Sequence, residues 1–395
     1  MLRALFVQYT DPAGYPPIQH SMAMLEREGW NITSVGTRIT VTSDLRMPPE
    51  PCIKSYLMRA VPASGLAQKI HYLYFCFLTA VVALRLRPDL IYVSDMIATP
   101  AALLASRLTR SRIVYQEHDS PNAAKGGVDR LLRRARAAVC RLATRSITPN
   151  ASRSRLLAEQ TGVAADSVVT VFNCPLQSEI FASASVDADR SENAKFWLYY
   201  HGSIVPDRLP LAVVDALALL PARVCLRIVG YETQGTKGYV EALKQRACDH
   251  NMQDRLDIVG PVSRFSLHQF ARASHVGLSL MPMASRDLNM VHMVGASNKP
   301  FDYLANGCPL IVSDLPDWRQ MFVEAGVASC CDPSSPEGIY KAVNYWLRQP
   351  ETYRTARWDG VALVTERWNY ELQFEPVMAA LRSNTKCGDT TRIPV

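Results

Sequence analysis

The sequence lacks the recurring motifs of several common protein classes. Its ten cysteines are scattered and form no C-x-x-C pair. Neither a metal site nor a disulfide framework is therefore expected, and reduced thiols in a cytoplasmic setting fit better. No G-x-G-x-x-G follows an expected strand, which argues against a nicotinamide or flavin dehydrogenase. Residues 230–238, GYETQGTKG, miss the Walker spacing because Thr236 stands where a lysine is needed, so nucleoside triphosphate hydrolysis is not expected.

Charge and long apolar runs are also scarce. Charged residues make up 20% of the chain, and the net charge of +7 permits a polyanionic ligand or an anionic membrane surface. No nucleic-acid partner and no signal peptide are expected. The longest apolar run, residues 70–84, is shorter than a helix that spans a bilayer. Because Lys69, Arg85 and Arg87 flank it, interfacial insertion is the alternative to the buried core helix that we expect.

What is present is an alternation of short apolar strands and helices over 395 residues. That alternation requires parallel pairing with helices on both faces of each sheet. We expect an α/β protein with two doubly wound, Rossmann-like domains that face a cleft. The expected parts are a first domain, a linker poor in apolar residues, a second domain, and a terminal helix with a flexible tail: residues 1–175, 176–195, 196–368 and 369–395.

Polar residues follow an apolar strand near residues 113–115. Glu117, His118 and Asp119 come directly after it, and open α/β sheets bind ligands beyond the carboxyl ends of their strands. These residues are therefore candidates for a functional site, and a solvated loop is the alternative. Gly14 lies in the loop after the first strand, where it could equally serve only to turn the chain.

Residues 297–314, SNKPFDYLANGCPLIVSD, predict a short helix that enters a buried strand. The backbone amides of residues 295–298 would then lie at a helix N-terminus, a favourable place for a phosphate or diphosphate. Lys299 could add a point charge, and Asp302 is placed to accept hydrogen bonds from a ribose. The alternative is an ordinary helix-to-strand unit of an α/β sheet.

This stretch resembles the donor site of the retaining GT-B-type glycosyltransferases of glycosyltransferase family 4 (group 1). In that family an E-x7-E segment, followed by a helix, Gly-x-Pro and a strand, holds the nucleotide sugar. Asp302 stands at the second acid position and Val294 at the first. The resemblance covers nearly the whole chain in coarse order, and implies that the terminal helix crosses back to the first domain.

The resemblance implies roles for individual residues. Gly202 would let the backbone approach the diphosphate, Arg208 would neutralise phosphate charge, and Ser203 stands where the family has an arginine. Gly260 and Val262 would contact the nucleotide base. The full implied donor-binding set is Gly14, Gly202, Ser203, Arg208, Gly260, Val262, Gly295, Ser297, Asn298, Lys299 and Asp302. His118 and Asp119 are the expected catalytic residues, and no metal or other cofactor is expected. Asp187-Ala188-Asp189 looks like a D-x-D metal motif but lies in the expected linker, so it is discounted.

The implied function is metal-independent transfer of a hexose from a nucleotide diphosphate sugar to an acceptor hydroxyl, with retention, in glycan or glycolipid synthesis. The acceptor would be a glycan or a lipid-linked molecule. The expected location is cytoplasmic. A helix with several arginines is expected at residues 128–145, and it could add peripheral contact with the inner face of a membrane. A GT-B-fold sugar-nucleotide epimerase and a non-catalytic partner subunit are the alternatives.

Overall fold

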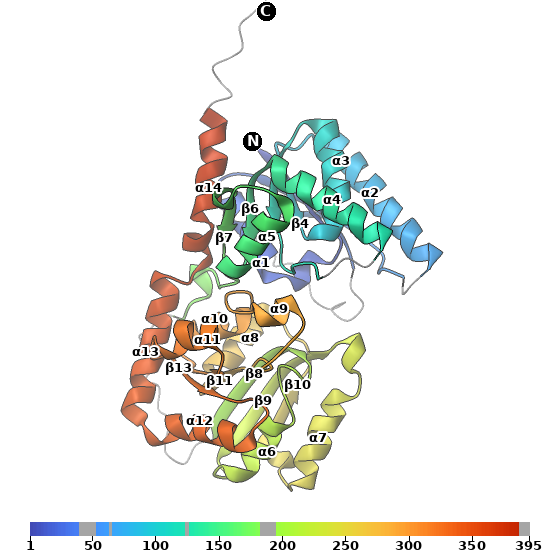
Figure 1. Ribbon diagram of the computed structural model, residues 1–395. Coiled ribbons are helices and arrows are strands. Elements are labelled where there is room, and N and C mark those ends of the chain that lie inside the picture. The colour runs from blue at the N-terminus through green and yellow to red at the C-terminus, as the bar shows by residue number, and fades with distance from the viewer. Residues whose placement is uncertain (39–52, 63–64, 123–125, 182–194, 387–395) are drawn as a thin grey trace, which may run out of the picture. The chain divides into compact units, whose positions relative to one another are not determined.

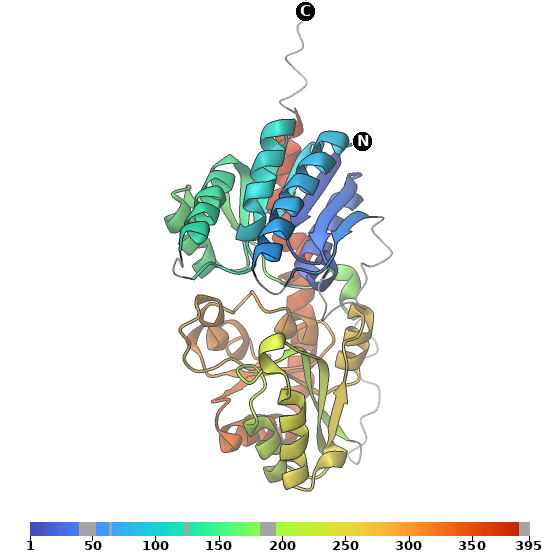
Figure 2. The same cartoon turned by 90° about the vertical axis from the view of Figure 1, so that its right-hand side faces the viewer.

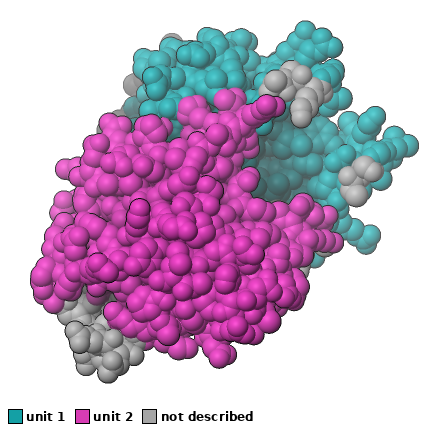
Figure 3. Space-filling view, turned by 60° about the horizontal axis from the view of Figure 1, so that its bottom comes forward, with its two compact units in different colours: residues 1–173, 370–395 teal, residues 174–369 magenta. Residues whose placement is uncertain are grey.

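The computed structural model describes residues 1–38, 53–62, 65–122, 126–181 and 195–386. They form two compact units, one of residues 1–173 with 370–395 and the other of residues 174–369 (Figures 1 and 3). The discounted D-x-D triplet at residues 187–189 lies outside the described residues. Residues 174–181 belong to the second unit.

Unit 1 is built on a seven-stranded, fully parallel sheet with the order β3-β2-β1-β4-β5-β6-β7. Its strands are β1 (Arg3–Gln8), β2 (Asn31–Thr37), β3 (Lys54–Met58), β4 (Leu90–Ser94), β5 (Arg112–Gln116), β6 (Ala143–Thr148) and β7 (Val168–Thr170). The central strand β4, LIYVS, is buried at every position, as a strand covered on both faces should be. This confirms the doubly wound α/β architecture predicted for the first half.

Helices cover both faces of that sheet. They are α1 (Pro16–Arg27), α2 (Leu66–Leu86), α3 (Thr99–Thr109), α4 (Gly127–Leu142), α5 (Ala151–Thr161) and α14 (Tyr370–Lys386). One core cluster joins the inner side chains of α2, α3, α4 and α5 to the same sheet face. The hydroxyl of Tyr370, on α14, forms a hydrogen bond of 2.7 Å with the hydroxyl of Ser21 on α1. The side chain of Arg112, on β5, donates a hydrogen bond to the carbonyl of Leu381 on α14. The last helix is therefore part of the first unit.

Unit 2 contains a six-stranded parallel sheet with the order β10-β9-β8-β11-β12-β13. Its strands are β8 (Phe196–Ile204), β9 (Val224–Glu232), β10 (Leu256–Val259), β11 (Val276–Ser279), β12 (Leu310–Ser313) and β13 (Ala328–Cys331). Its helices are α6 (Ala212–Leu219), α7 (Tyr239–Asp249), α8 (Arg264–Arg272), α9 (Leu288–Val291), α10 (Asn298–Leu304), α11 (Pro316–Trp318), α12 (Pro336–Arg348) and α13 (Pro350–Glu366). The core on one face joins α6, α7 and α12, and α10 contacts α8 and α13.

The sequence analysis did not identify β3, β13 or α13. The strands β3 (KSYLM) and β13 (ASCC) lie at sheet edges and lack a run of strongly apolar residues. Helix α13 has only four buried residues among seventeen, one of them a glycine, so its apolar periodicity is weak. The formation of these three elements therefore depends on strand pairing or tertiary packing and not on a local sequence pattern.

Helix α2 is longer and more exposed than the sequence suggested. It spans 21 residues, and by length and composition alone it is the one helix in the described part of the chain that could cross a membrane. Only 22% of its most apolar stretch is buried. The expectation of a buried core helix is therefore wrong for its outer side, although Phe75, Val82 and Ala83 do face the core. In Figure 2, α2 is the helix of the first unit drawn in lighter blue.

Candidate functional site

The predicted donor residues of unit 2 gather where the direction of chain winding reverses. From β8 the chain proceeds to β9 and β10 on one side, and then returns to β11, β12 and β13 on the other. Ligands of open parallel sheets bind beyond the carboxyl ends of the strands at such a reversal. Gly202 lies near the end of β8, and α10 follows β11 and contacts β8. The fold thus brings Gly202 and the residues of α10 to that point.

Gly202 and Lys299 lie against each other. Gly202 has a φ of 109°, a conformation that residues with a side chain rarely adopt. A Cβ atom at this position would also lie 3.3 Å from Cε and 3.6 Å from Nζ of Lys299. Glycine therefore provides both the backbone conformation and the room for the lysine side chain.

Lys299 is a buried basic residue whose amine lies near an aromatic ring. The residue is 6% exposed, and its Nζ lies 5.2 Å from the centroid of the Tyr200 ring. Among the described residues, no carboxylate lies within ion-pairing distance of Nζ. Burial, and then the charge of Arg208, hold the pKa of Lys299 well below its usual value. An anion at this place would reverse that effect, because an opposite charge favours the protonated amine.

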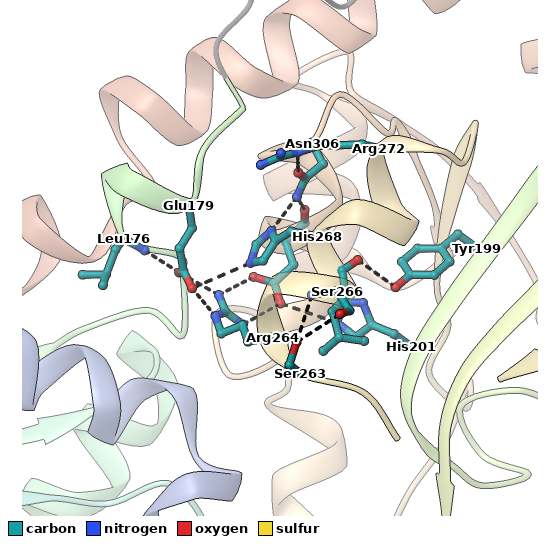
Figure 4. Close-up of polar contacts among 12 residues, drawn as sticks. Leu176, Glu179, Tyr199, His201, Ser263, Arg264, Ser266, His268, Arg272 and Asn306 are labelled. Carbon is teal, nitrogen blue, oxygen red and sulfur yellow. Dashed lines mark hydrogen bonds and ion pairs between the residues drawn. The ribbon is translucent and has the colours of Figure 1, made fainter. Parts of the chain in front are cut away.

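Asp302 is held by Arg264. Nη2 of Arg264 donates to Oδ1 of Asp302 at 2.9 Å, and Nη1 donates to Oδ2 at 3.2 Å. The same guanidinium donates to both carboxylate oxygens of Glu179, with Nη2 to Oε2 at 2.9 Å. Figure 4 shows Arg264 beside Glu179, with His268 and His201 around it. A single arginine therefore joins two acids, one before and one after it in the chain.

The charges around Asp302 keep it ionised. Burial alone would raise the pKa of Asp302, but Arg264 and His201 hold it far below its usual value. Nε2 of His201 lies 3.5 Å from Oδ2 of Asp302, and burial lowers the pKa of His201. Burial and Arg264 likewise lower the pKa of His268 to about 4, and its Nδ1 is 2.7 Å from Nδ2 of Asn306. Both histidines are therefore neutral near pH 7, beside an ionised carboxylate.

The backbone amides predicted for phosphate binding are only partly open. The N–H groups of Ala296 and Ser297 donate to the carbonyl of Met293, at 2.9 Å and 3.1 Å. They are used in the turn before α10, in which Gly295 takes a φ of 79°. The helix itself has only seven residues. The expectation that the amides of residues 295–298 all point to a ligand is therefore wrong for two of them.

The remaining predicted residues of unit 2 lie along the same edge of the sheet. Ser203 follows Gly202 on β8, where its carbonyl accepts the Tyr200 hydroxyl at 2.5 Å. Gly260 is exposed directly after β10, and Val262 is half-buried just before α8. Because parallel strands end at one edge, these loops lie on the carboxyl side together with Gly202. Asn298 is the first residue of α10, and Ser297 precedes it as the N-cap.

In unit 1, His118 lies at the carboxyl end of β5 beside the end of β4. Its backbone N–H donates to Oδ1 of Asp95 at 2.8 Å. Burial and Arg153 lower the pKa of His118 to about 4, so its imidazole is neutral at pH 7. Its ring centroid lies 5.5 Å from that of Tyr15, which follows Gly14. The loop of Gly14 and the predicted catalytic histidine are thus neighbours within unit 1.

The acids next to His118 have different environments. Glu117 is fully buried and accepts two hydrogen bonds from Arg136 and one from Tyr115. Asp119 is exposed. Burial and the neighbouring Asp119 raise the pKa of Asp95 to about 7. Glu117 therefore supports the end of β5, whereas Asp95 and Asp119 remain as titratable groups beside His118.

Sequence reasoning missed Arg264, Glu179, His201 and Asp95. Arg264 is the first residue of α8 and lies two residues after Val262, a predicted contact of the base. Its closeness in sequence to Val262 is the signal that could have identified it. Glu179 lies in the segment expected as linker and gave no signal, because its partner is 85 residues away. In the described part of the chain, no group of three or more histidine, cysteine or acidic residues is arranged to hold a metal ion.

Known proteins resemble this chain in sequence profile and in fold. The family described as Glycosyltransferase Family 4 matches residues 22–174, and the family described as Glycosyl transferases group 1 matches residues 186–358. Among proteins of curated function, none matches significantly.

Solved structures match over nearly the full length. HepE of Anabaena, solved with UDP and glucose, is 17% identical with a TM-score of 0.67, covering 97% of this chain and 100% of HepE. Sucrose-phosphate synthase of Thermosynechococcus elongatus is 14% identical with a TM-score of 0.70, covering 98% and 100%. WaaG, a glycosyltransferase involved in lipopolysaccharide biosynthesis, is 13% identical with a TM-score of 0.62, covering 96% and 98%. With its two parallel-sheet domains and both family matches, this chain belongs to the GT-B-fold glycosyltransferases of family 4 (group 1).

Proposed function

We propose that this glycosyltransferase, which uses a nucleotide-sugar donor, transfers a hexose with retention to a hydroxyl of a glycan or lipid-linked acceptor. The observation that carries the donor site is the buried Lys299 beside Gly202, with no carboxylate in ion-pairing distance among the described residues. A buried cation is costly unless a counter-charge is present. The diphosphate of the donor would supply that charge.

Charge neutralisation of the leaving diphosphate is the main demand of the reaction. Lys299 and Arg208 would stabilise the negative charge as the bond from the sugar to the diphosphate breaks. Gly202 has no side chain and lies against Lys299, so phosphate oxygens could approach its backbone and the lysine together. Because no carboxylate nucleophile is identified, we propose that the acceptor attacks from the face that the diphosphate leaves, and that the diphosphate takes the acceptor proton. The neutral His118 would orient the incoming hydroxyl or the donor sugar.

Asp302 would bind the ribose while it remains paired with Arg264. A carboxylate offers about four lone-pair positions; the two hydrogen bonds from Arg264 occupy two of them, and Nε2 of His201 lies 3.5 Å from Oδ2. A remaining position can accept a hydrogen bond from a ribose hydroxyl. Gly260 and Val262 would contact the base, on the same edge of the sheet.

Isothermal calorimetry with nucleotide diphosphates tests the donor site. Because the solved structure of HepE holds UDP, UDP is the first nucleotide to compare with GDP, ADP and CDP. We expect one nucleotide to bind, and Lys299→Met to weaken it by about tenfold to a hundredfold, the usual loss of one charge-assisted hydrogen bond. Lys244→Met, at an exposed lysine of α7, should leave binding unchanged. If no nucleotide binds the wild type, the donor-site assignment is wrong.

Product analysis tests the reaction. Incubation of the matching sugar nucleotide with candidate acceptors should yield a glycoside with the anomeric configuration of the donor, read by NMR. A new sugar nucleotide formed without any acceptor would show an epimerase instead. Donor binding with no turnover under any condition would support a non-catalytic partner subunit.

A further inference from the structure

The outer side of α2 carries a continuous apolar stripe. The side chains that form it are spaced by three, four or seven residues, apart from the adjacent Leu73 and Tyr74, and this spacing places them on one face of the helix. They are between 50% and 72% exposed: Leu66, Ile70, Leu73, Tyr74, Phe77 and Leu84. Scattered apolar residues are normal at a protein surface, but a contiguous row over five helical turns indicates an interaction site.

The stripe continues onto the neighbouring helices. Helices α2, α3 and α4 pack on the same face of the sheet, since their inner side chains share one core with the strands. Helix α3 contacts both α2 and α4, as Figure 1 shows. Their outer sides therefore all point away from the sheet, and together they form a surface that we call the outer layer. It adds the following exposed apolar side chains: Leu104 and Leu108 of α3, and Val128, Leu131 and Leu142 of α4.

The charges of the outer layer are almost all positive. Asp129 is the only acidic residue within the three helices, and it pairs with Arg133 at 3.0 Å. The exposed cations on and directly after these helices are Lys69, Arg85, Arg87, Arg107, Arg110, Arg130, Arg134 and Arg141. Apolar side chains interleaved with arginine and lysine are typical of a protein surface that binds to an anionic lipid interface.

We propose that the outer layer of unit 1, centred on α2, binds the surface of an anionic lipid bilayer. The stripe of α2 would insert at the level of the head groups, and the arginines of α3 and α4 would contact lipid phosphates. The helix would lie on the bilayer without crossing it, because Phe75, Val82 and Ala83 are held in the core of unit 1. The proposal does not depend on the transferase activity, which is tested on unit 2.

A second copy of the chain fits this surface less well. A symmetric contact through α2 would bring the same cations of both copies together, with one acidic residue in the three helices to offset them. An anionic bilayer instead supplies negative charge over the entire area.

Vesicle flotation of the full chain tests the proposal without donor or acceptor. We expect the wild type to float with vesicles of 70% phosphatidylcholine and 30% phosphatidylglycerol at about 0.1 M NaCl, where surface charges are only partly screened. The double variant Leu73→Ser/Phe77→Ser should lower the partition coefficient at least about tenfold, because each buried apolar side chain contributes strongly to transfer. Leu219→Ser, at an exposed leucine of α6 in unit 2, is the matched control and should bind like the wild type.

A second variant tests the charge of the surface. Arg130→Glu/Arg134→Glu keeps the apolar stripe, and should reduce binding by about fivefold or more for each arginine removed. Both variants change exposed side chains, so their melting temperatures should equal that of the wild type and their effects can be assigned to binding. Three results would overturn the proposal: no flotation of the wild type, unchanged flotation of both variants, or a dimer in solution that Leu73→Ser/Phe77→Ser dissociates while vesicles are ignored.

Discussion

At the scale of single residues, the proposed donor site depends on the buried Lys299, which has no carboxylate within ion-pairing distance among the described residues. Burial, and then the charge of Arg208, hold the pKa of Lys299 well below its usual value. A diphosphate bound beside it would raise that pKa again. Ligand binding and proton uptake are therefore coupled at this residue.

This coupling predicts a pH dependence of donor affinity. Above the pKa of Lys299 in the empty site, binding must take up a proton, so affinity should fall as pH rises through that pKa. Calorimetry in two buffers with different ionisation enthalpies measures the proton uptake directly. In Lys299→Met the uptake should disappear, and in Lys244→Met it should remain. Equal apparent enthalpies of the wild type in both buffers would contradict the prediction.

The pair of Arg264 and Asp302 predicts a large effect on stability. Arg264→Met leaves Asp302 and Glu179 without their shared cation, and breaking a buried ion pair costs about 3–5 kcal/mol. Urea unfolding followed by circular dichroism measures the loss. Arg354→Met removes an exposed pair with Glu351 and should cost less than about 1 kcal/mol. Similar losses in the two variants would show that the Arg264 pair has no special role.

The pair of Arg264 and Asp302 also determines how the stability of the fold changes at acid pH. The folded-state pKa of Asp302 lies below its unfolded value, so the pair stabilises the fold fully above about pH 4. That contribution is lost as pH falls towards the folded-state pKa. In Arg264→Met the corresponding slope of stability with pH, between about pH 4 and pH 2, should be reduced.

At the scale of elements, the position of α10 depends on a close contact with β11. The ring of Tyr303 lies over Gly277, and a Cβ atom there would be 2.2 Å from the ring. The hydroxyl of Tyr303 also accepts the backbone N–H of His201 on β8 at 2.9 Å. Helix α10, which carries Lys299 and Asp302, is therefore fixed to two strands by one side chain.

Gly277→Ala should shift α10 away from the sheet. Overpacking of this kind costs about 1–3 kcal/mol, and displacement of Lys299 and Asp302 should weaken nucleotide binding. Thermal unfolding and calorimetry measure the two effects together. Gly127→Ala, where a Cβ would meet nothing within 4 Å, should change neither. If Gly277→Ala keeps full affinity, α10 is not positioned by this contact.

At the scale of the whole molecule, the first unit is completed by the end of the chain. Helix α14 inserts Phe374, Val377 and Met378 into the core, far in sequence from the strands that they cover. We expect Phe374→Ala to cost about 3–5 kcal/mol, because it removes a fully buried ring. Leu372→Ala, at a side chain that is 49% exposed on the same helix, should cost less than about 0.5 kcal/mol. Denaturant unfolding of both variants checks the prediction, and equal losses would contradict it.

The sequence by itself determined most of the secondary structure, the two parallel sheets and the family. Strands such as LIYVS and LIVS are apolar throughout because both faces are covered, and that pattern is local. Lys299 and Asp302 could be selected because residues 297–314 carry a motif of their own, and Gly202 and Arg208 from the resemblance to family 4. Local patterns also predicted His118 at the end of its strand.

Only the tertiary structure decided which partners these residues have. Arg264 pairs with both Asp302 and Glu179, which are distant from it in the chain. The hydrogen bonds from two amides to the Met293 carbonyl depend on turn geometry, and the N–H of His118 donates to Asp95 on a neighbouring strand end. The exposure of the outer side of α2 could not be predicted either, because an apolar run has the same sequence pattern whether one face of the helix is covered or both. Burial and charge pairing are properties of the folded neighbourhood, and sequence periodicity reports only one element at a time.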